Sequence, residues 1–222
     1  FLAGLAMIGV RYLDNNDFQT FPNLCPIGNK LWYLIIHHNS IKNISDSHID
    51  CMTRLKELRL ESNLLTEIPD VSGPSNRLRY LNLNDNLFAN FPSMTNLGKS
   101  VEVLYLNDNP LSFIEPEKLE PLKKLTHLEI LGTNIANIPD FSLVAGSIQI
   151  IHLSKTGHET RIAVAGQNEL QSLNGVPTIY LQGTDLTYFP PVCFDRPTTL
   201  YLEGSPLDLC SCNLLWLKRA VE

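Results

Sequence analysis

The chain has 222 residues, of which 44% are hydrophobic and 18% are charged, and its formal net charge is −6. This composition excludes a disordered chain and leaves enough apolar material for a continuous core. The acidic balance argues against nucleic acid as a partner. The sequence also has no apolar run of about 18 residues, so we expect no direct membrane insertion of this segment.

The chain begins with an apolar stretch from Phe1 to Val10 that is similar to the core of a signal peptide. It has neither a basic flank nor a small-residue cleavage site. We therefore interpret it as the tail of one repeat that leads into the next.

An internal repeat follows along the whole chain. Leu55 to Pro69 has the pattern L-x-x-L-x-L-x-x-N-x-L-x-x-I-P. The same apolar frame starts at residues 8, 31, 55, 78, 101, 125, 148, 176 and 197. Each L-x-L centre alternates between inward and outward positions, which predicts a short strand. No single copy can bury its apolar face alone, so the copies must stack into a curved solenoid.

This pattern resembles the leucine-rich-repeat family, with the period common in extracellular members. The resemblance implies an α/β solenoid: a horseshoe with a parallel β-sheet on its concave face, about nine repeats and an irregular convex side. We expect the repeats to cover residues 1–204. The segment from about 157 to 175 does not follow the template and is predicted to be a loop insertion.

A polar residue ends each predicted strand, and its type changes along the chain. The ladder consists of Asn16, Asn39, Asn63, Asn86 and Asn109, then Thr133, Thr156, Thr184 and Ser205. An amide both donates to and accepts from buried backbone groups, whereas a hydroxyl is smaller and has no carbonyl. We therefore predict a locally different turn in the second half. Arg11 occupies an apolar position of the first copy, which predicts a poorly defined edge there.

Cys25 and Cys51 lie in successive repeats on the side away from the strands. We predict a disulfide between them, and the alternative is two small buried hydrophobic residues. Cys193 occupies the same frame position as Cys25 and is expected to be a core residue or a free thiol. The sequon Asn43-Ile44-Ser45 makes Asn43 a candidate glycosylation site.

Residues 205–222 resemble the beginning of the cysteine-rich cap that closes extracellular leucine-rich repeats. The resemblance rests on Cys210-Ser211-Cys212 and the apolar Leu214-Leu215-Trp216-Leu217 that follows. In the family these two cysteines bond to later ones, so we expect the cap to continue beyond Glu222; the alternative is a buried thiol pair. Such a cap implies an oxidising compartment, and hence an extracellular or cell-surface location.

The outward strand positions are predicted to form a recognition surface. Six of the seven tyrosines fall on them, and tyrosine is a frequent interface anchor; the alternative is that tyrosine simply favours exposed strands. The candidate partner-binding residues are Tyr12, Tyr33, Ile35, Glu57, Arg59, Glu61, Tyr80, Tyr105, Glu129, Tyr180 and Tyr201.

Charge on this surface is predicted to be acidic. Extended past the strand ends, it carries nine carboxylates, and its basic residues are Arg59 and Lys155. We therefore expect a protein partner with a basic patch and salt-dependent association.

The sequence contains none of the common catalytic motifs. His127, Glu129 and His152 are predicted to lie close together, and we favour a solvated polar patch over a metal site. His37 and His38 are expected to point in different directions. We predict no enzyme, cofactor or metal, but a protein-binding module of a secreted or cell-surface protein. The alternative is a structural component of an extracellular matrix or large extracellular assembly.

Overall fold

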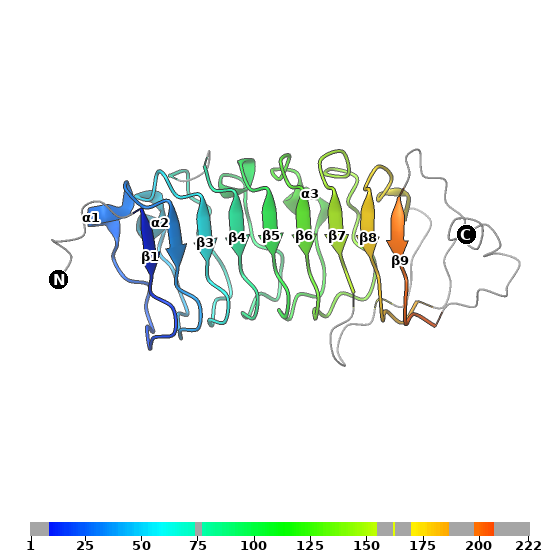
Figure 1. The fold of residues 1–222 in the computed structure, drawn as a ribbon, viewed down its shortest axis with the longest axis horizontal. Coiled ribbons are helices and arrows are strands. Elements are labelled where there is room, and N and C mark those ends of the chain that lie inside the picture. Colours follow the sequence, from blue (N-terminus) through cyan, green and yellow to red (C-terminus); the bar gives the residue numbers. More distant parts are fainter. Residues whose placement is uncertain (1–8, 74–76, 155–161, 163–169, 187–197, 207–222) are drawn as a thin grey trace, which may run out of the picture.

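The computed structural model describes residues 9–73, 77–154, 162, 170–186 and 198–206. Nine three-residue strands form one parallel sheet in chain order, along an elongated solenoid (Figure 1). The strands are β1 (Val10–Tyr12), β2 (Tyr33–Ile35), β3 (Glu57–Arg59), β4 (Tyr80–Asn82), β5 (Val103–Tyr105), β6 (His127–Glu129), β7 (Ile150–His152), β8 (Thr178–Tyr180) and β9 (Thr199–Tyr201). The predicted parallel sheet and its nine strands are confirmed.

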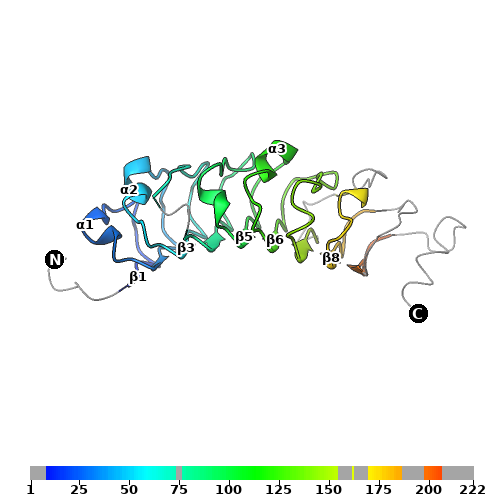
Figure 2. The ribbon, with the colours of Figure 1, turned by 90° about the horizontal axis from the view of Figure 1, so that it is seen from above.

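The side of the solenoid away from the strands is irregular. Figure 2 shows the strands along one gently bowed edge and the short helices along the opposite one. These helices are α1 (Cys25–Gly28), α2 (Asp46–Asp50), η1 (Leu97–Lys99) and α3 (Pro116–Leu119). Both α1 and α3 have a proline in their first turn, where the missing N–H leaves no hydrogen bond unmade. Within the described residues, no helix has the length and apolar character needed to cross a membrane.

The strand pairing places the middle residue of each strand inward. Leu58, Leu81 and Leu104 are register partners on successive strands and are fully buried. Burial of each such side chain stabilises the fold by about 1.5–3 kcal/mol. Arg11 occupies this inward row in β1, where it is 8% exposed and donates from Nη1 to the carbonyl of Val10. The predicted irregularity at Arg11 is wrong, since β1 pairs with β2 in full register.

After every strand except β7, whose following turn lies outside the described residues, the chain turns through one residue with positive φ. In the first five repeats these residues are Asn15, His38, Ser62, Asp85 and Asp108, and in later repeats they are Gly132, Gly183 and Gly204. The backbone therefore keeps a left-handed turn residue where the ladder changes from asparagine to threonine. The predicted difference between the halves lies in residue type and side-chain bonding, not in the handedness of this turn.

The asparagine ladder bonds neighbouring turns to one another. Asn86 Nδ2 lies within hydrogen-bond distance of three carbonyl oxygens, those of Leu60, Leu83 and Asn84, and Oδ1 accepts from the Leu65 N–H. The hydroxyl of Thr133 at the equivalent position donates to the carbonyl of Ile130 at 3.1 Å. Thr133 thus bonds within its own turn, whereas farther along the ladder the Ser205 hydroxyl donates to the carbonyl of Leu181 in the turn before it.

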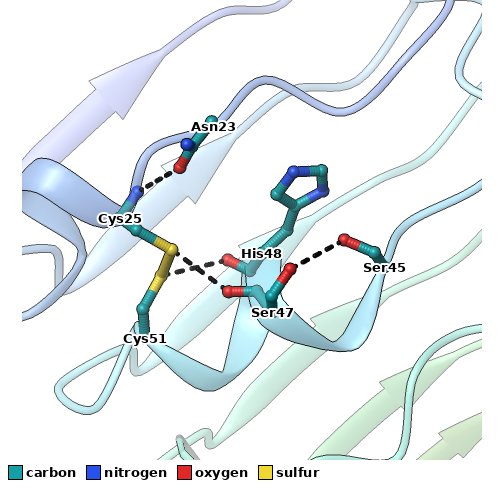
Figure 3. Close-up of a disulfide and its surroundings, with 6 residues drawn as sticks. All are labelled: Asn23, Cys25, Ser45, Ser47, His48 and Cys51. Carbon is teal, nitrogen blue, oxygen red and sulfur yellow. Dashed lines mark hydrogen bonds between the residues drawn. A yellow bond between two sulfur atoms is a disulfide. The ribbon is translucent and has the colours of Figure 1, made fainter.

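A disulfide joins Cys25 and Cys51 across the first two turns, with an S–S distance of 2.14 Å (Figure 3). Cys25 lies at the start of α1 and Cys51 directly after α2. A Cβ added at Gly28 would come within 2.9 Å of the Cys51 carbonyl oxygen, so a glycine allows this close approach. Cys193, Cys210, Cys212, the predicted cap from residue 207 onward and most of the predicted loop insertion lie outside the described residues.

Candidate recognition surface on the concave face

The first and third residues of each strand point outward and form two rows across the sheet. The first row comprises Val10, Tyr33, Glu57, Tyr80, Val103, His127, Ile150, Thr178 and Thr199. The third row comprises Tyr12, Ile35, Arg59, Asn82, Tyr105, Glu129, His152, Tyr180 and Tyr201. All candidate partner-binding residues lie in these rows except Glu61, which follows β3 by two positions.

A hollow of about 350 Å³ opens on this surface at strands β1 to β3. We call it the N-terminal hollow, and it is lined by Val10, Tyr12, Tyr33, Ile35, Glu57 and Arg59. Tyr12 stands at its edge with 72% of its surface exposed. The structure therefore brings five of the predicted site residues together around one concavity.

A charged and aromatic cluster occupies the centre of the face. Arg59 Nε donates to Glu57 Oε1 at 2.5 Å, and the guanidinium lies 5.2 Å from the centre of the Tyr80 ring. The Tyr80 ring meets Tyr105 edge to face at 5.4 Å. Burial disfavours the charge of Arg59, but the hydrogen bond and charge of Glu57 outweigh it and raise the pKa of Arg59. Burial also raises the pKa of both tyrosines above the ordinary value, so their hydroxyls stay protonated.

A second asparagine series, which the sequence analysis missed, supports this cluster from one side. Asn84 Oδ1 accepts from the Asn107 N–H at 2.7 Å, and Asn107 Oδ1 accepts from the Leu131 N–H at 2.8 Å. Asn107 Nδ2 donates to Glu129 Oε2 at 2.9 Å. The signal was present as Asn-Asp-Asn in two consecutive repeats. These bonds hold the Glu129 carboxylate in place beside Tyr105.

An aromatic stack continues the face toward β9. The His152 and Tyr180 rings are 4.5 Å apart, and Tyr180 and Tyr201 stack at 4.4 Å with an interplanar angle of 7°. Glu129 is the register partner of His152 on the adjacent strand, as predicted. Burial lowers the pKa of His152, while the charge of Glu129 opposes part of this effect. Neutral imidazole is therefore favoured at this position.

His37 and His38 differ from the sequence prediction. Their Nδ1 atoms lie 2.7 Å apart, and their rings meet edge to face at 4.8 Å. The prediction assumed that both residues continue the strand, but β2 ends at Ile35 and His38 has a φ of 51°. This turn brings the second imidazole back to the first. Among the described residues, however, no group of three His, Cys, Asp or Glu side chains is arranged to hold a metal ion.

The outward face and its rim are strongly acidic. The carboxylates in and beside the strands are Asp14, Glu57, Glu61, Glu129 and Glu203. Those at the turn or just after it are Asp17, Asp85, Asp108 and Asp185. Arg59 is the one described basic residue of this set, and its charge is paired with Glu57; Lys155 lies outside the described residues. The face and its rim thus carry an excess of negative charge.

Comparison with known proteins supports the fold. Residues 29–88 match the leucine rich repeat family. The functional domain of InlJ from Listeria monocytogenes, which includes a cysteine ladder, is 17% identical with a TM-score of 0.65, over 90% of this chain and 40% of its own. A leucine-rich-repeat protein of Leptospira interrogans is 19% identical with a TM-score of 0.60, over 95% of this chain and 58% of its own. No curated protein matches the sequence.

These matches establish a leucine-rich-repeat solenoid. Such solenoids are generally protein–protein interaction modules and typically have no enzymatic activity. The chain spans less than two thirds of the length of either solved structure.

Proposed function

We propose that this chain is a protein-recognition module of a secreted or cell-surface protein, and that it binds its partner through the concave face. The observation that carries the proposal is the register of the sheet, which aligns six tyrosines in two outward rows. Tyrosine supplies a large contact area with a polar tip and loses little conformational entropy on binding.

The order already present on this face supports the same proposal. Tyr80 is held between Arg59 and Tyr105, and Tyr180 between His152 and Tyr201. Each side chain that is immobilised before binding removes about 0.5–1.5 kcal/mol of ordering cost from association. These tyrosine side chains are thus already ordered before binding, and a partner could bind them without a rearrangement of the sheet.

The charge on the face indicates the character of the partner. The described part of the face and its rim carries nine carboxylates and one guanidinium, and that guanidinium is paired with Glu57. We infer a partner with a lysine- or arginine-bearing patch, whose Kd increases with ionic strength because exposed charges are screened.

The disulfide supports the proposed location. A bond between Cys25 and Cys51 persists in an oxidising compartment and is rare in the cytosol. The side chain of Asn43 is exposed, so the sequon is accessible to glycosylation. A glycan there would lie outside the two outward rows.

The test is capture of partners from the native source by the parent chain and two matched variants. One variant changes Tyr33, Tyr80 and Tyr105 to Ala. The control changes Leu64, Leu87 and Phe113 to Ala, which removes three exposed large side chains that lie outside the outward rows. Circular dichroism and Tm establish that both variants are folded.

We expect the control to capture the same protein as the parent and the tyrosine variant to lose it. If the folded tyrosine variant still captures that protein with unchanged affinity, the concave face is not the recognition surface.

A further inference from the structure

We propose that the N-terminal hollow is an anchor pocket for an arginine side chain of the partner. This inference rests on the proposed function, because it identifies the group that the concave face recognises. It depends on the surroundings of Glu57, on the apolar wall of the hollow and on the charge around it.

Glu57 has a tyrosine on each side in the first outward row. Its register partners are Tyr33 on β2 and Tyr80 on β4. On the Tyr80 side the chain's own Arg59 already lies over the ring and donates to Oε1 of the carboxylate. The carboxylate and a tyrosine ring thus bind a guanidinium on that side.

The N-terminal hollow lies on the other side of Glu57. It is lined by Tyr33 and Glu57 but not by Tyr80. Oε2 of Glu57 takes part in no hydrogen bond with the described part of the chain. The Tyr33 side of the hollow therefore repeats the combination of tyrosine and carboxylate, while the Arg59 guanidinium, which also lines the hollow, is paired with Oε1 of Glu57 and leaves Oε2 open. Guanidinium suits this combination better than ammonium, because it stacks on aromatic rings and binds carboxylates through a planar fork.

The remaining lining fits the stem of the side chain. Val10 and Ile35 are half-buried and supply apolar surface. Tyr12, 72% exposed, stands at the edge, where it can cover an inserted chain. An arginine buries its methylene groups along such a surface and keeps its charged end near polar groups.

The charge near the hollow favours a cation despite the presence of Arg59. Asp14 and Glu61 follow β1 and β3, and both are half-buried. Glu61 Oε2 is buried and has no hydrogen-bond partner in the described structure. Glu57 and Glu61 both interact with the charge of Arg59, so carboxylates outnumber guanidinium groups beside the hollow even without Asp14. An incoming positive charge meets a net negative environment.

The experiment is an NMR titration of the ¹⁵N-labelled 222-residue chain with N-acetyl-arginine amide. N-acetyl-citrulline amide, which has nearly the same shape but no charge, is the control ligand, and N-acetyl-lysine amide tests the preference for guanidinium. The variants are Glu57→Gln and Tyr33→Ala. Glu67→Gln is the matched control, because it removes the same charge from an exposed site that does not line the hollow.

We expect saturable shifts of amide signals from β1 to β3 with the arginine amide. We also expect weaker binding of the citrulline and lysine amides. Glu57→Gln is expected to increase Kd by about fivefold or more, since a charge-assisted hydrogen bond is lost. Glu67→Gln should match the parent. The spectrum of each variant also reports whether it is folded.

Three results would overturn the assignment: shifts spread evenly over all acidic repeats, equal binding of the citrulline or lysine amide, or an unchanged Kd in Glu57→Gln. This outcome is separable from that of the partner capture. If the tyrosine variant loses the partner but the arginine amide does not bind, the concave face stands and the anchor pocket fails. If partner capture does not depend on the tyrosines, the proposed function fails whatever the amide does.

Discussion

The two halves of the solenoid build the same turn from different residues. In the half from Asn16 to Asn109, the residue before each asparagine is Asn, His, Ser or Asp with positive φ, and from Asn39 onward the amide bridges adjacent turns. In the half from Thr133 to Ser205, a hydroxyl takes the place of the amide and the described turn residues are glycines. A glycine adopts this conformation without steric cost, so the left-handed turn of the second half does not depend on the identity of a side chain at that position.

The largest expected effect tests the amide itself. Asn86→Ala removes an amide whose two Nδ2 hydrogens are shared among three carbonyl oxygens, and it leaves the buried Leu65 N–H without its acceptor, so we expect a loss of about 3 kcal/mol in the free energy of unfolding. Thr133→Ala removes one bond to Ile130 and should cost about 1 kcal/mol. Urea unfolding measures both values. Equal losses would contradict the difference between the halves.

The second effect concerns the turn residue. Gly132 has a φ of 62°, and a Cβ at this angle is strained, so Gly132→Ala should cost about 1–2 kcal/mol. Asp85→Gly replaces a residue with a φ of 51° by one that adopts it freely. It should change stability by less than about 0.5 kcal/mol. A large loss in Asp85→Gly would show that the Asp85 side chain, not the backbone, stabilises this turn.

A third change introduces a ladder asparagine into the second half of the solenoid. Thr133→Asn places an amide next to Asn109 in the ladder, where it can accept from the backbone of the previous turn, as Asn109 accepts from the Phe88 N–H. We expect a gain of about 1 kcal/mol in the free energy of unfolding. Thr133→Val is the control for volume. A loss in Thr133→Asn would show that the second half has no room for the longer side chain.

The smallest effect is the pH response of the second half. Burial lowers the pKa of His152, so the unfolded chain takes up this proton at a higher pH than the folded chain. Stability therefore falls as the pH drops below about 6.5, the ordinary histidine value. In His152→Gln the fall in Tm between pH 7.5 and 5.5 should be smaller by about 1–2 °C. Tyr180→Phe keeps the imidazole and the ring contact, and it should follow the parent.

The repeat frame predicted the register of all nine strands, because an inward residue in every copy leaves no alternative pairing that buries the core. The candidate face followed directly from that register, including the adjacency of Glu129 and His152. Its use by a partner remains a prediction.

Contacts that depend on local backbone angles or on side-chain rotamers could not be predicted from the repeat frame. The approach of His37 to His38 needs a positive φ at a non-glycine residue, which is uncommon and which the repeat pattern does not specify. The position of Arg59 over Tyr80, and not over Tyr33, depends on side-chain rotamers that periodicity does not determine. Arg11 was expected to disturb its strand, but its long side chain reaches the carbonyl of Val10 without disrupting the pairing.

The strict alternation of the strands also bears on how such a gene can change over time. A point mutation in an outward row alters the face and leaves the inward row intact. Insertion or deletion of one codon within a strand would exchange the inward and outward sets for that turn. Point substitutions can therefore change the outward surface while the fold is kept. Insertions or deletions of one residue within a strand cannot, because they would place polar residues in the core. Changes in length are confined to the connecting segments, and the longest step of the repeat, from residue 148 to 176, lies in such a segment.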